Sequence, residues 1–405
     1  MQKFDVIIVG GGAAGFFTAI NLATFRPDFS IAILERGKEV LTKVKVSGGG
    51  RCNVTHAEFL PEELIKNYPR GEKELRGPFH HFMTGDTMAW FEEHGVALKI
   101  EEDGRVFPTT NDSQTIIDCF LSETKKLGIQ VLQNHSLQKL IIDDTGWQLE
   151  TNQGGMHTTK LVLATGSNPK MWRLLQGLGH QTIAAVPSLF TFNIRDSRIK
   201  DLPGIATSAS VKVIGTKLSS EGPLLITHWG MSGPAILKLS AWGARELEGL
   251  GYNFKVSVNW LVDQTDTMAL ESLKGLKEDH LRQQVGKYAQ FELPKRLWRS
   301  LLSASGVDLD MRWADLNNKQ LEHIALQLTA ARFSVSGKST FKEEFVTAGG
   351  VSLKEVDFKT FASRKLPNLY FAGEILNIDA ITGGFNFQNA WTGGFLVAKA
   401  IAEKS

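Results

Sequence analysis

Short hydrophobic runs that end at glycines or carboxylates recur along the chain and predict a parallel β-sheet. Four such runs cover residues 6–9, 31–34, 161–164 and 369–372. Residues 13–26 follow the first run with apolar positions at helical spacing, and Pro27 ends this helix. Strand, glycine turn and helix in this order are typical of a Rossmann-like α/β domain.

The rest of the hydrophobic pattern predicts a meander and an inserted domain. Strand-like runs at 130–132, 139–142 and 147–150 are separated by turns. Further β-like runs at 189–194, 209–214 and 254–258 precede a polar, helix-favouring part at 265–328. We therefore expect one domain formed by residues 1–186 and 333–405, interrupted by a β-rich and helical domain at 187–332.

Composition narrows the class of protein only slightly. The chain has 405 residues, 42% hydrophobic and 22% charged, with a formal net charge of +2, which gives no independent support for nucleic-acid binding. Two cysteines cannot form a disulfide framework, and their spacing suggests no zinc site. The first residues lead directly into a strand, without room for a signal peptide, and no apolar run is long enough to span a bilayer. We expect a cytoplasmic protein without a metal site or a membrane segment.

The turn after the first strand carries a dinucleotide-binding pattern. Gly10, Gly12 and Gly15 fit G-x-G-x-x-G, in which the glycines allow a tight turn, close approach of a pyrophosphate and close helix packing. Glu35 ends the second strand, 20 positions after Gly15, where a carboxylate can bind an adenosine ribose. An ordinary glycine-rich turn that holds no ligand is the alternative.

Two further glycine turns have chemistry suited to a ligand. Residues 48–50 are three consecutive glycines between Ser47 and Arg51, which suggests backbone held close to a ligand, with a flexible surface loop as the alternative. Near the end, Glu374 follows a strand and Gly383-Gly384 opens a helix. Such a turn can offer N–H groups to an anionic ring edge.

These motifs together resemble the BaiN-like FAD-dependent oxidoreductases, a family that includes aminoacetone-oxidase-like enzymes, and more distantly the fumarate-reductase flavoproteins. The segments that carry the resemblance run in the family's order along essentially the whole chain. They are residues 9–15, 47–55, 104–108, 227–234, 346–351 and 383–386. His56 departs from the pattern, because the family usually has Asn at that position.

The resemblance implies a split FAD-binding domain of three layers, with an insert formed by a barrel-like part and a small helical part. It also places residues along the cofactor, with the pyrophosphate at the first glycine loop, adenine at the Leu137 backbone and the flavin at the last turn. With the patterns above, the expected cofactor-binding residues are Gly10, Gly12, Ala13, Ala14, Gly15, Glu35, Arg36, Lys43, Ser47, Gly50, Arg51, Cys52, Asn53, Leu137, Thr165, Gly166, Gly373, Glu374, Gly384, Phe385 and Asn386.

Catalysis in such a protein needs a hydride path and a proton carrier. A substrate would place its reacting carbon near the flavin N5, and His228 and Ser232 are the candidate acid–base residues. A packed, hydrogen-bonded role is the alternative for His228. Cys52 is interpreted as packing against the cofactor rather than as a redox thiol activated by Arg51. Arg105 either binds a substrate carboxylate or anchors its own turn.

Three functions remain open at this point. The leading hypothesis is a reductase or dehydrogenase that moves a hydride between flavin and a small or medium organic substrate, with NAD(P)H as transient reductant. The second is an oxidase that passes electrons to O2, as amine-oxidase-like relatives do. The third is a flavoprotein that acts on RNA, for which Lys3, Lys43 and Lys45 form too small a basic face. We expect no nucleic-acid partner, and a homo-oligomer is left open.

Overall fold

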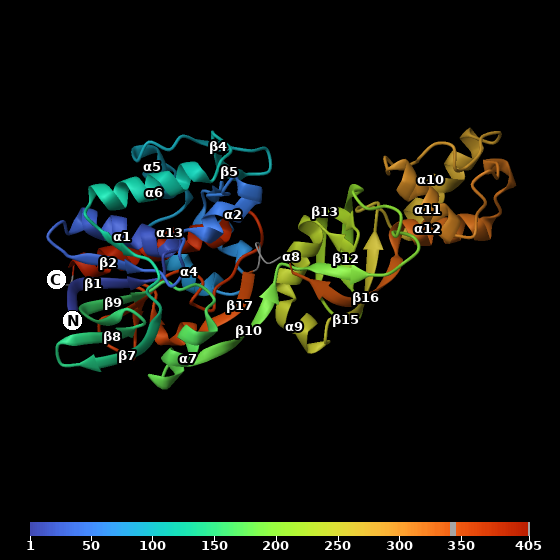
Figure 1. Cartoon of the computed structure of the whole chain (residues 1–405). Helices are drawn as coiled ribbons and strands as arrows, with labels where there is room; N and C mark the ends of the chain where they lie inside the picture. The colour runs from blue at the N-terminus through green and yellow to red at the C-terminus, as the bar shows by residue number, and fades with distance from the viewer. Residues whose placement is uncertain (341–345, 404–405) are drawn as a thin grey trace. The chain divides into compact units, whose positions relative to one another are not determined.

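A computed structural model describes residues 1–340 and 346–403. The chain divides into two compact units, Met1–Val186 with Lys342–Ser405, and Pro187–Phe341 (Figure 1). We call them unit 1 and unit 2. The expected return to the first domain at residue 333 is wrong, because strand β16 (Ala331–Ser339) pairs with β15 (Asn253–Asn259) and β11 (Thr191–Ile194) of unit 2. Residues 341–345, in the expected second segment, lie outside the described part.

Unit 1 is built on a largely parallel sheet with the order β18-β19-β20-β9-β1-β2-β6. The half of β9 that precedes residue 159 also pairs antiparallel with β8, which pairs with β7, so the meander branches from this strand. The strands are β1 (Gln2–Val9), β2 (Ile31–Leu34), β6 (Gln130–Leu132), β7 (Leu137–Asp143), β8 (Gly146–Thr151), β9 (Gly154–Leu163), β18 (Val356–Asp357), β19 (Ala362–Ser363) and β20 (Leu369–Phe371).

Helices and short strands complete unit 1. The helices are α1 (Ala13–Phe25), α2 (Thr42–Gly50), α3 (Pro61–Leu64), α4 (Glu72–Phe79), α5 (Thr84–Glu93), α6 (Gln114–Lys126), α7 (Pro169–Gly177) and α13 (Phe385–Glu403). Strands β3 (Thr55–His56), β5 (Arg105–Pro108) and β4 (Leu98–Ile100) form a small sheet, and β10 (Thr182–Ser188) pairs with β17 (Val346–Val351).

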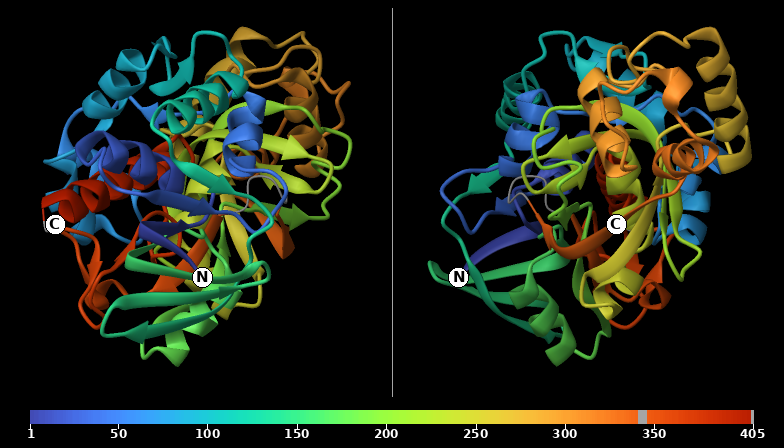
Figure 2. Two further views of the ribbon diagram at one scale, coloured as in Figure 1. Left: turned by 60° about the vertical axis from the view of Figure 1, so that its left-hand side comes forward. Right: turned by 90° about the vertical axis from the view of Figure 1, so that its right-hand side faces the viewer.

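The centre of unit 1 is a buried hydrophobic core. Val6, Ile7 and Ile8 of β1 are fully buried, as expected for a strand covered on both faces. Helix α1 is buried along almost its whole length, because α13 lies beside it (Figure 2). The two helices approach closely at Gly394, where a Cβ would lie 3.0 Å from Thr18 Oγ1. The absence of a Cβ at Gly394 therefore lets the first and the last helix of the chain approach each other closely.

Unit 2 is a closed antiparallel barrel in the order β11-β14-β13-β12-β15-β16. Its other strands are β12 (Ala206–Val213), β13 (Ser219–Thr227) and β14 (Gly230–Ser232), and its helices are α8 (Pro234–Trp242), α9 (Ala244–Gly249), α10 (Asp266–Asp279), α11 (Lys295–Ala304) and α12 (Asn318–Thr329). The barrel and the helical part α10–α12 agree with the sequence-based expectation. Pro234 opens α8, and Gly233 is its N-cap.

Within residues 1–340 and 346–403, no helix has both the length and the apolar character needed to cross a membrane.

A buried polar cluster attaches the edge of the unit 1 sheet to the segment after α7. His180 Nδ1 lies 2.8 Å from Glu355 Oε2, and His180 Nε2 lies 3.0 Å from the Ser363 hydroxyl. Lys365 Nζ donates to the other oxygen of Glu355 at 2.6 Å. Burial lowers the pKa of His180 despite the neighbouring carboxylate. For Glu355, burial alone would raise the pKa, but hydrogen bonds from Lys365, the Gln181 N–H and His180 hold it below the usual value.

Both shifts predict that the protein loses stability in mild acid. Because the pKa of His180 is lower in the folded state than in the unfolded state, the unfolded chain takes up this proton first as pH falls below the ordinary pKa of 6.5. Stability is therefore fully present above pH 6.5 and decreases below it, with a further loss below pH 4.5 from Glu355. Urea unfolding of His180→Asn should show a loss of about 1–3 kcal/mol at pH 7.5 and a smaller drop between pH 7.5 and 5.5 than the wild type shows. His81→Gln, at an exposed position, is the control, and equal drops in wild type and His180→Asn would contradict the prediction.

Candidate functional site

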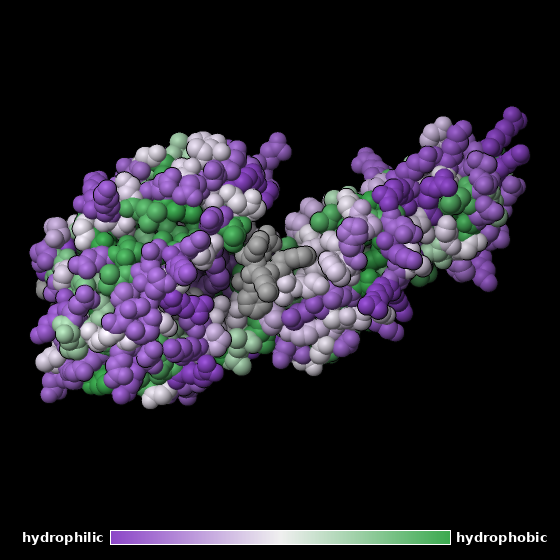
Figure 3. All heavy atoms as spheres, in the orientation of Figure 1, coloured by the Kyte–Doolittle hydropathy of each residue, from purple (hydrophilic) through white to green (hydrophobic). Residues whose placement is uncertain are grey.

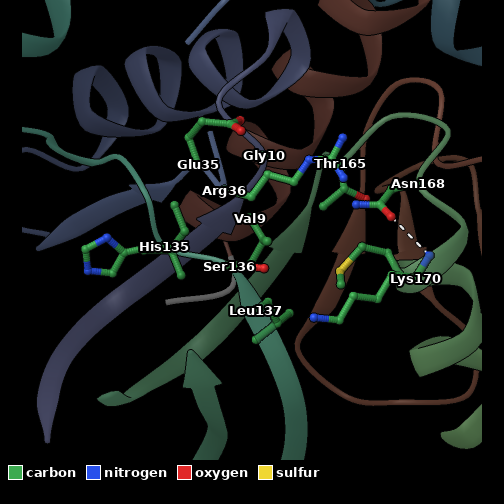
Figure 4. Close-up of a pocket in the computed structure, with 12 residues that line it drawn as sticks. Val9, Gly10, Glu35, Arg36, His135, Ser136, Leu137, Thr165, Asn168 and Lys170 are labelled. Carbon is green, nitrogen blue, oxygen red and sulfur yellow. Dashed lines mark hydrogen bonds between the residues drawn. The ribbon is translucent and has the colours of Figure 1, made fainter. Parts of the chain in front are cut away.

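A small pocket opens at the carboxyl edge of the parallel strands of unit 1 (Figure 4). Five residues that the sequence predicts to bind the cofactor line it: Gly10, Glu35, Arg36, Leu137 and Thr165. They come from the ends of β1, β2 and β9 and the start of β7. Ligands bind at this edge in open α/β sheets because loops and helix N-termini gather there.

The first glycine loop has the geometry that a close ligand requires. Gly10 has φ +119°, and a Cβ there would lie 2.3 Å from the Ala164 carbonyl oxygen. A Cβ at Gly15 would lie 2.0 Å from the Gly10 oxygen, so this glycine serves helix packing. A Cβ at Gly12, by contrast, would meet no other atom within 4 Å in the part of the chain that the structure describes. Gly12 also precedes α1 without a side-chain cap, so the open space adjoins the first N–H groups of the helix, which the predicted residues Ala13 and Ala14 begin.

Glu35 holds this loop in place. Its Oε2 accepts a hydrogen bond from the Gly11 N–H at 3.0 Å, and its Oε1 accepts one from the Gly37 N–H at 2.8 Å. Each oxygen retains a further lone pair, so the carboxylate can still accept from a ribose hydroxyl. Its predicted ligand role therefore stays a prediction, alongside a structural role that the spacing did not reveal.

The glycine triplet adopts backbone angles that other residues avoid. Gly48, Gly49 and Gly50 have φ of +58°, +69° and +85°, and a Cβ at the last two would meet no atom of the described residues within 4 Å. Asn53 is 8% exposed, and its Oδ1 is buried without a hydrogen-bond partner in the described part of the chain. Open backbone positions and an unpaired acceptor in the same short segment fit a polar ligand better than a mobile loop.

Cys52 and the arginines beside the triplet serve the protein itself. Burial raises the pKa of the Cys52 thiol to about 12, which agrees with packing rather than redox chemistry. Arg51 donates to Glu101 at 2.7 Å and stacks on the Phe107 ring at 3.9 Å. Arg105 donates to Asp103 at 2.7 Å. This ion pair is the one expected if Arg105 anchors its own turn rather than binding a substrate carboxylate.

The segments after β20 come back to the same edge. Gly373 has φ +74°, and a Cβ there would lie 3.1 Å from that of Ala14. Glu374 accepts from Lys43 Nζ at 2.5 Å and lies near Gly166, whose own Cβ would be 3.7 Å from its Oε2. Two predicted cofactor contacts are thus paired with each other.

The turn that opens α13 is fixed from several sides. A Cβ at Gly384 would lie 2.5 Å from the Thr55 carbonyl oxygen, so this turn packs directly on β3. Asn386 Oδ1 accepts from the Ala380 N–H at 3.0 Å, and Tyr68 donates to the Phe385 carbonyl at 2.6 Å. Ser47 likewise bonds within its own segment, to the Val44 carbonyl at 2.8 Å.

Gln388 is fully buried in the first turn of α13 and connects this helix to β3 and α5. Its Oε1 accepts from Thr55 at 2.6 Å and from Thr87 at 3.0 Å. Trp391, one helical turn later, donates to the Val54 carbonyl at 2.9 Å. These bonds keep the triplet segment and the N-terminus of α13 at a constant separation.

The residues present fit a bound dinucleotide. Besides Asn53, the buried Thr165 Oγ1 has no partner among the described residues, and it lines the cavity. Open glycine positions, unpaired buried acceptors and two helix N-termini on one edge are the features that hold pyrophosphates and ring edges. No group of three or more His, Cys, Asp or Glu in the described residues could hold a metal ion.

The two predicted catalytic residues lie in unit 2 and do not contact each other by any described hydrogen bond. His228 is exposed in the turn between β13 and β14, and Trp229 beside it is 60% exposed. The alternative of a packed histidine is therefore wrong. Ser232 accepts a hydrogen bond from Thr191 at 2.9 Å.

Sequence reasoning missed several residues of the site. The cavity is also lined by His135, Ser136, Asn168, Lys170 and Met171 (Figure 4). Asn168 caps α7 by accepting from the Lys170 N–H at 3.0 Å, and Asn before Pro169 was a readable N-cap signal. Near the last turn, His56 stacks on Phe385 with ring centroids 4.6 Å apart.

The tautomer of His56 follows from its partner. Its Nε2 lies 3.1 Å from the Asp103 carbonyl oxygen, which can only accept, so Nε2 carries the proton. Nδ1 then presents a lone pair, buried and unpaired within the described chain. Burial lowers the pKa of this imidazole, which keeps it neutral near pH 7.

The chain is similar to known proteins over its whole length. It is 29% identical to the ribosomal RNA dihydrouridine synthase of Escherichia coli over 100% of both chains. It is 25% identical to the 3-dehydro-bile acid delta(4,6)-reductase of Clostridium scindens over 98% of both. Among solved structures, the 3-ketosteroid delta1-dehydrogenase of Sterolibacterium denitrificans matches all of both chains with a TM-score of 0.54 and 12% identity. This last likeness shows the fold alone.

Gly10 and Gly12 provide a matched test of the first loop. Gly12→Ala is expected to change the apoprotein's stability by about 1 kcal/mol or less, because its Cβ enters open space. FAD affinity should nevertheless fall about tenfold or more, since that space is where a pyrophosphate would lie. Gly10→Ala should destabilise the apoprotein itself by about 1–3 kcal/mol through its positive φ. Thermal unfolding of the apo forms and FAD titration measure both, and unchanged FAD affinity in Gly12→Ala would contradict the placement.

The family of the chain follows from a match that covers almost all of it. Residues 4–400 match the family described as HI0933-like protein Rossmann domain. The sheet, the glycine loops and the barrel described above agree with that match. The protein therefore belongs to the HI0933-like family of FAD-dependent oxidoreductases with a Rossmann-like FAD-binding domain.

Proposed function

We propose that this FAD-dependent oxidoreductase reduces a carbon–carbon double bond conjugated to a carbonyl group, and that its substrate is uridine in ribosomal RNA. The observation that carries the proposal is the full-length similarity to a ribosomal RNA dihydrouridine synthase. The bile acid relative is also a reductase of double bonds near a keto group. Uridine and a keto steroid share an alkene activated by a neighbouring carbonyl, so one chemistry suits both.

The reaction adds a hydride to one alkene carbon and a proton to the other. When bound, FAD supplies the hydride through its N5. NAD(P)H is the reductant that we propose, and it would act transiently, because only one glycine fingerprint is present in the sequence. The chain's own residues must bind the cofactor, orient the alkene and deliver the proton.

The residues that would hold FAD lie along one edge of the sheet of unit 1. The adenosine end would occupy the cavity lined by Glu35, Arg36 and Leu137. The pyrophosphate would lie over Gly12 and the start of α1, where the backbone is open. The flavin end would reach the Gly384 turn, where the N–H groups of α13 can stabilise negative charge on the ring. Lys43 and Glu374, now paired at 2.5 Å, can bind this end of the cofactor in different ways. Lys43 can donate to ring or ribityl oxygens, and Glu374 can accept from ribityl hydroxyls.

His228 is the proton carrier that we propose. Its imidazole is exposed, so both water and a bound substrate can reach it. The exposed indole of Trp229 suits stacking on an unpaired base. An RNA substrate must present its target base out of the stack, and an aromatic side chain beside a proton donor would receive such a base.

A small conjugated ketone is the second candidate substrate. It is favoured by the similarity to the bile acid reductase and by the sequence-based expectation of a small or medium organic substrate without a nucleic-acid partner. That expectation stays a prediction. The oxidase hypothesis requires O2 as the electron acceptor, and peroxide release in air tests it.

An anaerobic assay separates the three hypotheses. FAD-loaded protein reduced with NADPH is mixed with unmodified ribosomal RNA transcripts, and the return of the flavin absorbance is followed. We expect reoxidation and dihydrouridine in the digested RNA. A bile-acid-type enone is the comparison substrate, and peroxide release in air measures oxidase activity. Reoxidation by the enone alone, or fast peroxide formation without RNA reduction, would overturn the RNA substrate.

His228→Ala tests the proton carrier. It is expected to slow substrate-dependent flavin reoxidation about 100-fold, with FAD content unchanged, because the residue lies outside the predicted cofactor contacts. His323→Ala, an exposed histidine on α12, should behave as the wild type. Unchanged turnover in His228→Ala would remove His228 from the mechanism.

A further inference from the structure

Three adjacent strands of the unit 2 barrel carry basic residues and no acidic ones. Strands β12, β15 and β16 lie next to one another (Figure 1) and include Lys212, Lys255, Arg332 and Lys338 but neither Asp nor Glu. Their apolar residues point into the barrel, as the fully buried Val211 and Val256 do. The alternate residues face outward, and Lys212, Lys255 and Arg332 are exposed. We call the outer side of these three strands the basic face.

The strand register places the three exposed cations in one patch. Lys212 pairs with Ser257 across β12 and β15, and Ser257 pairs with Arg332 across β15 and β16. Lys255 lies two residues from Ser257 and therefore on the same side of β15. Because neighbouring strands are about 4.8 Å apart, Lys212 and Arg332 are roughly 10 Å from each other.

The protein does not neutralise these charges itself. Among the described residues, none of Lys212, Lys255 and Arg332 forms an ion pair within 4.0 Å. Glu221 on β13, opposite Ser210, marks the border of the basic face. On β11's side, Asp196 is already bound by Arg198 at 2.8 Å.

The excess of positive charge in unit 2 lies in its barrel and not in its helical part. The barrel segments, residues 187–260 and 331–341, have ten Lys and Arg against five Asp and Glu. The helical part, residues 261–330, has nine against ten. Hydrophilic residues cover much of the part of unit 2 that Figure 3 shows, so exposure alone does not distinguish the basic face. What distinguishes it is that cations gather there without acids, which produces a positive potential.

A protective role against strand pairing does not account for these lysines. Exposed lysines often protect the edge strands of open sheets from pairing with another chain. Here the barrel is closed, and β12, β15 and β16 each pair on both sides, so none of them is an edge.

We infer that the basic face binds the phosphate backbone of the RNA substrate. This inference rests on the proposed function and extends it to a surface outside the FAD-binding unit. Lys and Arg would contact phosphates, and the outward serines Ser208, Ser257 and Ser334 can donate hydrogen bonds to phosphate oxygens. Such contacts position the RNA without reading its sequence, and binding is weakened by salt because counterions are released.

The test replaces the three cations and compares the variant with an equal change elsewhere. The variant carries Lys212→Glu, Lys255→Glu and Arg332→Glu, and a milder version carries Ser at the same positions. The control carries Lys295→Glu, Arg312→Glu and Lys319→Glu, all exposed in the charge-balanced helical part. Unmodified ribosomal RNA transcripts are titrated with FAD-loaded protein at several salt concentrations, and thermal unfolding and flavin content verify folding.

We expect the Glu variant to lose RNA affinity at least tenfold, and the Ser variant to flatten the plot of log K against log salt by about 0.7–0.9 for each phosphate contact removed. The control should bind within threefold of the wild type. Wild-type affinity in both barrel variants, or an equal loss in the control, would overturn the inference. So would wild-type binding to phosphatidylserine vesicles without binding to RNA.

The design also separates failure of the inference from failure of the proposed function. If wild-type protein makes dihydrouridine in the transcripts and the Glu variant does so with the same KM, only the inference fails. If wild-type protein neither binds nor reduces RNA but reduces the enone, the proposed RNA substrate fails and the inference fails with it.

Discussion

The close contact between the first and the last helix of the chain is the constraint on which the site depends. Helices α1 and α13 meet at Gly394, where a Cβ would lie only 3.0 Å from Thr18 Oγ1. Gly373, in the segment after β20, packs near the start of both helices, where its Cβ would lie 3.1 Å from that of Ala14 and 3.9 Å from that of Ala390. Small residues at both contacts let the two N-termini reach one edge of the sheet, where their partial positive charges add. A larger residue at either contact would separate the helices and the loops that they begin.

A second constraint connects the triplet segment to this pair. Gln388 and Trp391 bond from α13 to Thr55 and the Val54 carbonyl, and Gly384 packs on Thr55 directly. Three segments far apart in sequence therefore form one rigid edge. The buried hydrogen bonds matter because an amide such as that of Gln388 would be costly to leave unpaired inside the domain.

Local backbone chemistry could be predicted from the sequence, and long-range pairing could not. Glycine at positions 48–50 is needed for positive φ, and such a requirement is visible in the residues themselves. The partner of Arg51, by contrast, is Glu101, fifty positions away in an unremarkable turn. The boundary at residue 333 failed for the same reason, because β16 completes a barrel whose other strands are distant in sequence. The basic face escaped notice because its cations are spread from Lys212 to Arg332 and meet only through strand register.

The predicted cofactor contacts divide into two kinds, and the division has a physical meaning. Glu35, Asn386 and the Lys43–Glu374 pair are bonded within the protein, so they shape the edge before any ligand arrives. Asn53 and Thr165 keep buried acceptors without partners in the described chain, at a cost in stability that a bound ligand would remove. The residues bonded within the protein hold the site in its binding geometry, so binding orders few further side chains. The unpaired residues add affinity because a ligand supplies their missing hydrogen bonds. Within this site, the unpaired Asn53 and Thr165 therefore indicate the path of the cofactor more directly than the residues that are bonded within the protein.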